Sequence, residues 1–167
     1  MVEATAVTAE GRISPGDMGV WKDEHIEPLA RIARFVEVQG AIPGIQLAHA
    51  GRKASCDAPW NGGGSLKTPA EGGWPVIGPS PLPFYADDPV PTPMSETDIE
   101  YCVEAWGTAA RRAQDAGFKV IELHAAHGYL MHEFLSPLSN RRTDNYGGSL
   151  ANRMRFLLTV ARRLRDI

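Results

Sequence analysis

Ala41-Ile42-Pro43-Gly44-Ile45-Gln46-Leu47 is an apolar run, and the polar run Ala48-His49-Ala50-Gly51-Arg52-Lys53 follows it directly. A short run that is apolar almost throughout predicts a strand buried on both faces, which is typical of parallel sheets. In parallel α/β folds, the polar residues that act on ligands follow the carboxyl ends of the strands. The stretch 41–53 therefore predicts a parallel sheet with a functional loop at its end.

The segments on either side of this stretch alternate between strands and helices. Val2 to Val7 and Phe118 to Leu123 are short apolar runs that predict two further strands. Helical spacing predicts helices from about Asp23 to Gly40, from Ser95 to about Ala116, and from Ser149 onward. Their expected buried faces are Ile26, Leu29, Ala30, Ala33 and Val36, then Ile99, Cys102, Val103, Trp106, Ala110 and Ala113, and finally Leu150, Met154, Leu157, Leu158, Ala161 and Leu164.

This βαβαβα order predicts buried strands in a parallel sheet with right-handed crossovers. Two parent folds fit it, an open doubly wound sheet and a slice of a (β/α)₈ barrel. Because no G-x-G-x-x-G motif follows any of the predicted strands, a dinucleotide-binding Rossmann domain is disfavoured.

Composition sets the class of protein. The chain has 167 residues, of which 43% are hydrophobic and 22% charged, as expected of one soluble globular domain. A net charge of −3 argues against binding to nucleic acid or to anionic lipid. The first residues lack the pattern of a signal peptide, and no apolar run is long enough to span a membrane. With Cys56 and Cys102 as the only cysteines, we expect a reduced, cytoplasmic protein.

Two long stretches without clear periodicity follow the second and third predicted strands. The first runs from Ala48 to Thr97 and includes the Pro- and Gly-rich region 54–94, far longer than an ordinary connection. Its aromatic residues, Trp60, Trp74, Phe84 and Tyr85, suggest that it packs against something. The second runs from His124 to Gly148 and contains a polar turn system, 139–149, expected to hold the loop in place.

Gln46 is the polar residue within the apolar run. A carboxamide carries both donors and acceptors, so it could pair with the imide edge of a flavin or a pyrimidine. A Gln hydrogen-bonded inside a barrel for structural reasons is the alternative, and from the residues alone it is favoured.

His124 and His127 follow the third strand directly, and Tyr129 comes two positions later. Two imidazoles that converge on one oxygen would polarise a carbonyl or bind an anion, and a phenol could supply a proton to carbon. A metal site that also uses His132 and Glu133 is a less favoured alternative, because the spacing is not that of a metalloprotease helix. The other alternative is that His124 and His127 have only a structural role.

Three motifs carry a resemblance to a known family. They are residues 44–52 (Gly-Ile-Gln-Leu-Ala-His-Ala-Gly-Arg), residues 124–130 (His-Ala-Ala-His-Gly-Tyr-Leu), and residues 134–149, which include Arg142-Thr143-Asp144 and Tyr146-Gly147-Gly148-Ser149. Together these motifs closely resemble the old yellow enzyme family of NADH:flavin oxidoreductases. Within it, they are most similar to the bacterial ene-reductase, NADPH dehydrogenase and xenobiotic reductase branch. Val2 to Val7 also matches the second barrel strand of that family, whereas 54–94 is variable.

The resemblance implies an FMN-containing (β/α)₈ barrel and a role for each matched residue. Ala4 would lie along the flavin, and Gln46 would hydrogen-bond its pyrimidine edge. The turn that runs from His124 through Ala125 and Ala126 to His127 would bind the substrate, with both histidines holding its oxygen. Tyr129 would be the nearby acid or a further substrate contact. NADH or NADPH would pass a hydride to flavin N5, and the hydride would then pass to the β-carbon of an activated alkene.

The 167 residues are fewer than the complete barrel of this expectation needs, because a (β/α)₈ barrel typically has about 250 residues. Residues 1–167 hold three βα units, placed as the second to fourth of eight, so we expect the central part of a barrel, incomplete at both ends. Two alternatives stay open. One is an inactive truncated fragment that does not bind FMN alone and associates at most with a complementary barrel segment or another copy. The other, less favoured, is a hydrolase with a metal on His124, His127 and His132, although we expect no metal.

Overall fold

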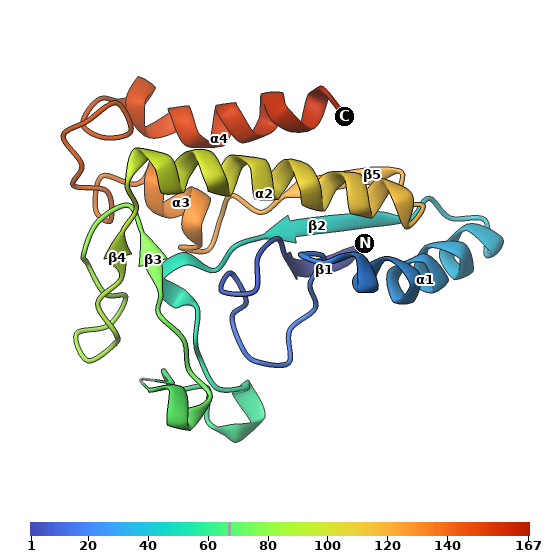
Figure 1. Cartoon of the computed structure of the whole chain (residues 1–167), viewed down its shortest axis with the longest axis horizontal. Coiled ribbons are helices and arrows are strands. Elements are labelled where there is room, and N and C mark those ends of the chain that lie inside the picture. The colour runs from blue at the N-terminus through green and yellow to red at the C-terminus, as the bar shows by residue number, and fades with distance from the viewer. Residues whose placement is uncertain (67) are drawn as a thin grey trace.

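Three parallel strands form the central sheet of the computed structural model, which describes residues 1–66 and 68–167. They are β1 (Val2–Ala6), β2 (Gly44–Ala48) and β5 (Val120–Leu123), and β2 lies between the other two. All three predicted strands are present, and both pairings are parallel as predicted. Figure 1 shows this sheet with helices stacked along one side of it.

Two of the strands, β2 and β5, begin later than predicted, and Pro43 explains the later start of β2. Proline has no N–H, so it cannot donate to a strand ladder, and β2 begins only at Gly44. The carbonyl oxygen of Pro43 accepts the N–H of Lys119 at 2.9 Å, one residue before β5 begins at Val120. The paired region of the sheet is therefore short, and it lies toward the carboxyl ends of the strands.

The prediction that the strands are buried holds for the central strand but is wrong for β5. Ile45 and Leu47 of β2 have no exposed surface. In β5, Val120 is 45% exposed and Glu122 is also exposed, because β5 lies at the sheet edge and its inner face is uncovered. Only Ile121 and Leu123 of this strand pack against the core.

The helix with the best-predicted buried face is α2 (Glu96–Asp115). All six residues of its expected face are buried, and the indole of Trp106 has no exposed surface. Ser95, the residue at which the helix was predicted to begin, caps it: its hydroxyl accepts the N–H of Asp98, and the Asp98 carboxylate accepts the N–H of Ser95. Figure 1 shows α2 running along the sheet, between β2 and α4 (Leu150–Arg165).

The predicted apolar face of α4 is only partly correct, because Leu157 and Leu164 pack against the core but other members of that face do not. The residues it buries are Phe156 and Val160, whereas Leu150 is 59% exposed and Leu158 is 38% exposed. The reason is that α4 packs mainly on other helices, and the centre of the Phe156 ring lies 4.7 Å from that of the Phe134 ring. In α1 (Ile26–Val38), the inner part of the expected face is buried: Leu29, Ala30 and Ala33.

The two long stretches contain more regular structure than predicted. The first includes a 3₁₀ turn η2 (Gly51–Lys53), two further 3₁₀ turns (Pro59–Asn61 and Pro69–Glu71), and the short parallel strands β3 (Ile77–Gly78) and β4 (Thr92–Pro93). The second contains the helix α3 (Leu130–Leu135). Residue 67, within the predicted loop 54–94, lies outside the described residues.

The aromatic residues of this loop were predicted to pack against something, and two of them differ. Trp74 anchors the loop through a 2.8 Å hydrogen bond from its Nε1 to the carbonyl oxygen of Glu10. Trp60, in contrast, is 86% exposed and does not pack.

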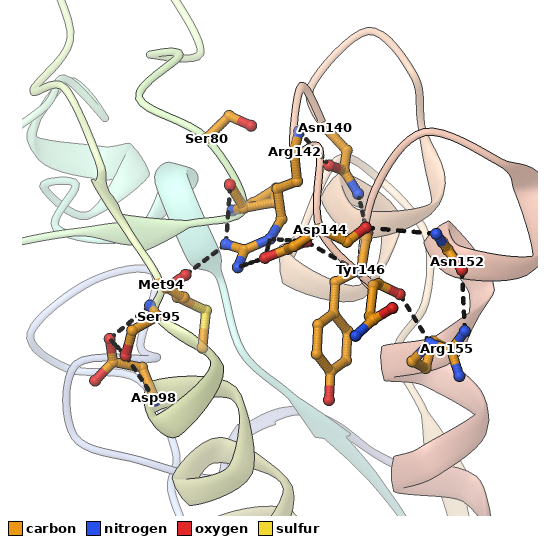
Figure 2. A network of polar contacts seen from close by, with 12 residues as sticks. Ser80, Met94, Ser95, Asp98, Asn140, Arg142, Asp144, Tyr146, Asn152 and Arg155 are labelled. Carbon is orange, nitrogen blue, oxygen red and sulfur yellow. Dashed lines mark hydrogen bonds and ion pairs between the residues drawn. The ribbon is translucent and has the colours of Figure 1, made fainter.

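Arg142 organises the polar turn system between α3 and α4, which was predicted to be architectural (Figure 2). Its guanidinium donates to the carbonyl oxygens of Met94 and Pro79 and forms an ion pair with Asp144. Asn140 donates to the carbonyl oxygens of Phe134 and Tyr146, both at 2.8 Å. These contacts connect the loop before α4 to the segments around β3 and β4.

Within the described residues, no helix is long and apolar enough to cross a membrane.

Candidate active site

The sheet register places Gln46 and His124 on one face. Gln46 of β2 pairs with Glu122 of β5, so these two side chains point to the same side. The N–H of His124 donates to the carbonyl oxygen of Leu47 at 2.9 Å, which extends the ladder beyond the end of β5. Because side chains alternate along a strand, His124 points to the same side as Glu122, two residues earlier. Two of the predicted site residues, one within β2 and one directly after β5, therefore point to the same face of the sheet.

Ala4 reaches the same place through an irregularity in β1. Its φ of +46° is unusual for a residue with a side chain, and the register of β1 against β2 shifts between Val2 and Thr5. The N–H of Ala4 donates to Oε1 of Gln46 at 3.1 Å. In a regular strand, this N–H would instead donate to a backbone carbonyl oxygen of the neighbouring strand. The structure thus brings together Ala4 and Gln46, the two residues assigned to the flavin.

The carboxamide of Gln46 keeps hydrogen-bonding capacity for a ligand. Oε1 accepts from Ala4, and Nε2 donates to the carboxylate of Glu122. A carboxamide has two N–H groups and two oxygen lone pairs, so one donor and one acceptor are left over. This donor set matches the alternating acceptors and donors of a flavin pyrimidine edge, so these residues fit the cofactor that the resemblance implies.

His124 is set up as a neutral hydrogen-bond donor. Its side chain is buried, and burial lowers its pKa from the usual 6.5, with a smaller contribution from the neighbouring His127. The N–H of Ala126 donates to Nδ1 at 3.3 Å, which assigns the ring proton to Nε2. At neutral pH, His124 therefore offers an N–H to a ligand oxygen without carrying a charge.

His127 and Tyr129 both lie against His124. The ring centres are 5.1 Å and 4.8 Å from that of His124, each in an edge-on arrangement. His127 is exposed and has a φ of +57°, so the turn holds it in a conformation that residues with side chains rarely adopt. Burial raises the pKa of Tyr129, so its phenol keeps its proton at neutral pH. Of the two alanines between the histidines, Ala125 packs against the core and Ala126 is exposed.

Lys53 joins this cluster from the other side. Its ammonium group donates to the carbonyl oxygen of His127 at 2.9 Å and lies 4.9 Å from the ring centre of Tyr129. The same group is 4.6 Å from the ring centre of Phe84, at the wall of a pocket of about 430 Å³. Lys53 was not among the predicted site residues. Its position in the polar run that follows β2 was the signal for a place at the site.

Glu122 is a site residue that sequence reasoning missed. It was counted only as part of a strand, although its carboxylate accepts from Gln46 and contributes to the electrostatic environment of His124. The signal that could have found it is the strand register, which cannot be read from one strand alone.

The residues proposed as extra metal ligands do not converge with the histidine pair. Nδ1 of His132 accepts the N–H of Gly128 at 2.9 Å, and the carboxylate of Glu133 turns away to accept the N–H of Arg52. Among residues 1–66 and 68–167, no group of three or more His, Cys, Asp and Glu side chains is placed to hold a metal ion.

The sequence profile of the NADH:flavin oxidoreductase / NADH oxidase family matches residues 1–167, the whole chain. The chain belongs to this family. The match confirms the resemblance drawn from the three motifs, and flavin is the cofactor that the family description itself names.

Named relatives agree with this assignment. The chain is 52% identical over 163 residues to NADH:flavin oxidoreductase FG08077 of Gibberella zeae, covering 96% of this chain and 40% of that protein. It is 46% identical over 167 residues to NADPH dehydrogenase of Bacillus subtilis, covering all of this chain and 45% of the relative. The chain therefore spans less than half the length of these relatives.

Solved structures confirm the fold class. Morphinone reductase superposes with a TM-score of 0.84 at 30% identity, over 98% of this chain and 45% of that structure. Morphinone reductase in complex with tetrahydroNAD superposes with a TM-score of 0.83 at 28% identity, over 99% of this chain and 47% of that structure. The described residues are part of a (β/α)₈ barrel, and their three strands do not close into a barrel.

Proposed function

We propose that this chain supplies the flavin-edge and substrate-oxygen groups of an FMN-dependent oxidoreductase that uses NADPH or NADH to reduce activated alkenes such as enones. The observation that carries the proposal is the shared sheet face of Gln46 and His124, with Tyr129 packed against the His124 ring. FMN, when bound, supplies the hydride chemistry between the nicotinamide and the alkene. The protein binds and orients the cofactor and the substrate, and it supplies a proton to the substrate.

Ala4 and Gln46 hold the cofactor in this proposal. The leftover N–H and lone pair of the Gln46 carboxamide bind the pyrimidine edge, and the Ala4 N–H keeps the carboxamide from rotating. The small side chain of Ala4 leaves the flavin room beside β1.

The histidine pair acts on the substrate oxygen. As a hydride adds to the β-carbon of an enone, negative charge develops on the carbonyl oxygen. N–H groups of His124 and His127 that are already in place stabilise that charge without reorganising. Tyr129 then gives its phenolic proton to the α-carbon, so one hydride and one proton together saturate the double bond. The turn residues Ala125 and Ala126 line the substrate side.

A chimera tests this function directly. In it, the present chain replaces the 167 matching residues of Bacillus subtilis NADPH dehydrogenase, to which it is 46% identical. We expect a yellow protein that keeps FMN through gel filtration and consumes NADPH in proportion to the 2-cyclohexen-1-one that it reduces. A chimera that folds by circular dichroism but stays colourless in excess FMN, or oxidises NADPH without reducing the enone, would contradict the proposal.

The chain alone is expected to bind FMN much more weakly than the chimera. Within the described residues, β1 and β5 each pair on one side only, so the sheet offers three strand ends to the cofactor. Quenching of FMN fluorescence measures both affinities. Equal dissociation constants for the chain and the chimera would show that these residues suffice and would exclude the truncated-fragment alternative.

Replacing Gln46 with leucine is expected to weaken FMN binding by the chimera. The substitution removes the carboxamide contacts and leaves the N–H of Ala4 without an acceptor. Such a loss costs about 1–3 kcal/mol, which is roughly a 5- to 150-fold rise in the dissociation constant of FMN. Glu122→Gln is the matched control, because an amide oxygen can still accept from Gln46. An unchanged FMN affinity in Gln46→Leu would rule out the assigned contact.

A further inference from the structure

Glu133 is a buried acid that the proposed chemistry does not use. It lies on α3, its side chain is 1% exposed, and its carboxyl group reaches η2, the turn that follows β2. Oε1 accepts the backbone N–H of Arg52 at 2.9 Å, across 81 residues of sequence. Oε2 is buried and has no partner among the described residues. A buried carboxyl group is costly, so its position calls for a physical reason.

Two glycines make room for this carboxyl group. A Cβ atom added to Gly51 of η2 would lie 2.1 Å from Oε1, and one added to Gly78 of β3 would lie 2.8 Å from Oε2. Gly51 also has a φ of +59°, which side chains rarely tolerate. The carboxyl group therefore occupies a cradle formed by two segments that are distant in sequence from α3.

The contacts of Glu133 lead to the histidine–tyrosine cluster by two routes. Its backbone N–H donates to the carbonyl oxygen of Tyr129 at 2.8 Å, at the first residue before α3. Its side chain fixes the amide of Arg52, next to Lys53, and Lys53 in turn donates to the carbonyl oxygen of His127. Glu133 thus connects both sides of the turn that carries His127 and Tyr129.

We propose that Glu133 is a positioning residue that fixes Lys53 and η2 against the 127–129 turn, and so places His127 and Tyr129 for the substrate. This inference rests on the proposed function, because the substrate is the enone considered above. The side chain of Glu133, which the test changes, touches neither substrate nor cofactor and acts through the amide of Arg52 and then Lys53. The Lys53 contact supports the strained backbone of His127, whose φ is +57°.

The protonation of Glu133 fits this role. Burial raises the pKa of the carboxyl group to about 8, against the opposing effects of the Arg52 N–H and the charges of Arg52 and Lys53. The group is therefore mainly neutral at pH 7, with one oxygen as acceptor and an O–H as donor. A glutamine has the same shape and also offers one acceptor and a donor, so it should replace Glu133 with little loss.

Amide hydrogen exchange in the present chain tests the connection without any activity. In Glu133→Leu, the amides of Arg52, Gly128 and Tyr129 are expected to exchange at least about tenfold faster than in the parent. In Glu133→Gln they should exchange as in the parent. Met131→Leu, a volume-conserving change in the core of the same helix, is the control for general loosening of α3. If Glu133→Leu fails to fold, Glu133→Asp, whose shorter side chain cannot reach Arg52, takes its place.

The same substitutions in the chimera separate this inference from the proposed function. Glu133→Leu is expected to raise the KM for 2-cyclohexen-1-one by at least about tenfold while FMN affinity stays unchanged, and Glu133→Gln should restore the parent KM. The positioning role would be overturned if exchange at Gly128 and Tyr129 does not respond to Glu133→Leu, or if the KM does not change in an active chimera. An inactive parent chimera with the expected exchange pattern would overturn the proposed function and leave the connection standing.

Discussion

Alanine in place of His124 is expected to lower the kcat/KM of the chimera for 2-cyclohexen-1-one by about 10²- to 10³-fold, the usual cost of losing one donor to a developing oxyanion. His124 is buried, neutral and protonated on Nε2, so the substitution removes an aligned N–H and not a charge. Steady-state rates at several enone concentrations measure the loss. FMN content should stay unchanged, because Gln46 and Ala4 retain their contact.

Two further variants sharpen this prediction. His124→Asn keeps an N–H donor near the position of the imidazole and is expected to recover at least about tenfold of the lost rate. His25→Ala is the matched histidine control, since His25 packs edge-on against Trp21 beside α1 and contacts none of the cluster. The assigned role fails if His124→Ala and His25→Ala have the same kcat/KM, or if His124→Asn is as slow as alanine.

Methionine in place of Arg142 is expected to destabilise the chain by about 2–4 kcal/mol, because it breaks a largely buried ion pair and leaves carbonyl oxygens unpaired. The Arg142 side chain is 9% exposed, and it joins Asp144 to the carbonyl oxygens of Pro79 and Met94 (Figure 2). Asp144 is itself 32% exposed and keeps some solvation, which sets the lower end of the range. Urea unfolding followed by circular dichroism measures the change in the free energy of unfolding.

The pH dependence of this loss checks its electrostatic part. Hydrogen bonds from Arg142 are the largest cause of a lowered pKa at Asp144, whose usual value is 3.8. A carboxyl group with a lowered folded-state pKa adds stability above its unfolded pKa and loses it as the pH falls through the folded value. The difference between parent and Arg142→Met is therefore expected to shrink below about pH 4.

A matched surface substitution shows what a weak ion pair contributes. Arg34→Met breaks a pair with Glu27 in which both side chains are more than half exposed, and it should cost no more than about 0.5 kcal/mol. Equal losses for Arg34→Met and Arg142→Met would contradict the assigned role of Arg142.

The buried faces of the helices show where sequence reasoning succeeds. In α2, the expected face is buried throughout, because that helix packs on the sheet through one continuous stripe with Trp106 at its centre. In α4, the helical spacing of apolar residues fits more than one buried stripe. Which stripe is buried depends on the surface against which the helix packs. That surface belongs to α2 and α3, so Phe156 and Val160 became the buried residues.

The short helix α3 was missed for a related reason. Its six residues are too few for helical periodicity to be recognised, and isolated helices of this length are not stable in water. Phe134 in the core and the carboxyl group of Glu133 in its cradle fix α3 through contacts with distant segments. From the sequence, Glu133 was considered only as a ligand in the less favoured metal site.

The sequence by itself determined the parallel sheet, the order of its strands along the chain, and the placement of Gln46 within one strand and of His124 directly after another. These features follow from local patterns: apolar runs, helical spacing, and polar residues directly after strands. Only the tertiary structure decided that Glu122 pairs with Gln46, that Lys53 reaches His127, and that Glu133 reaches Arg52. Each of these contacts joins residues more than seventy positions apart, so packing and register select them, and no single segment encodes them.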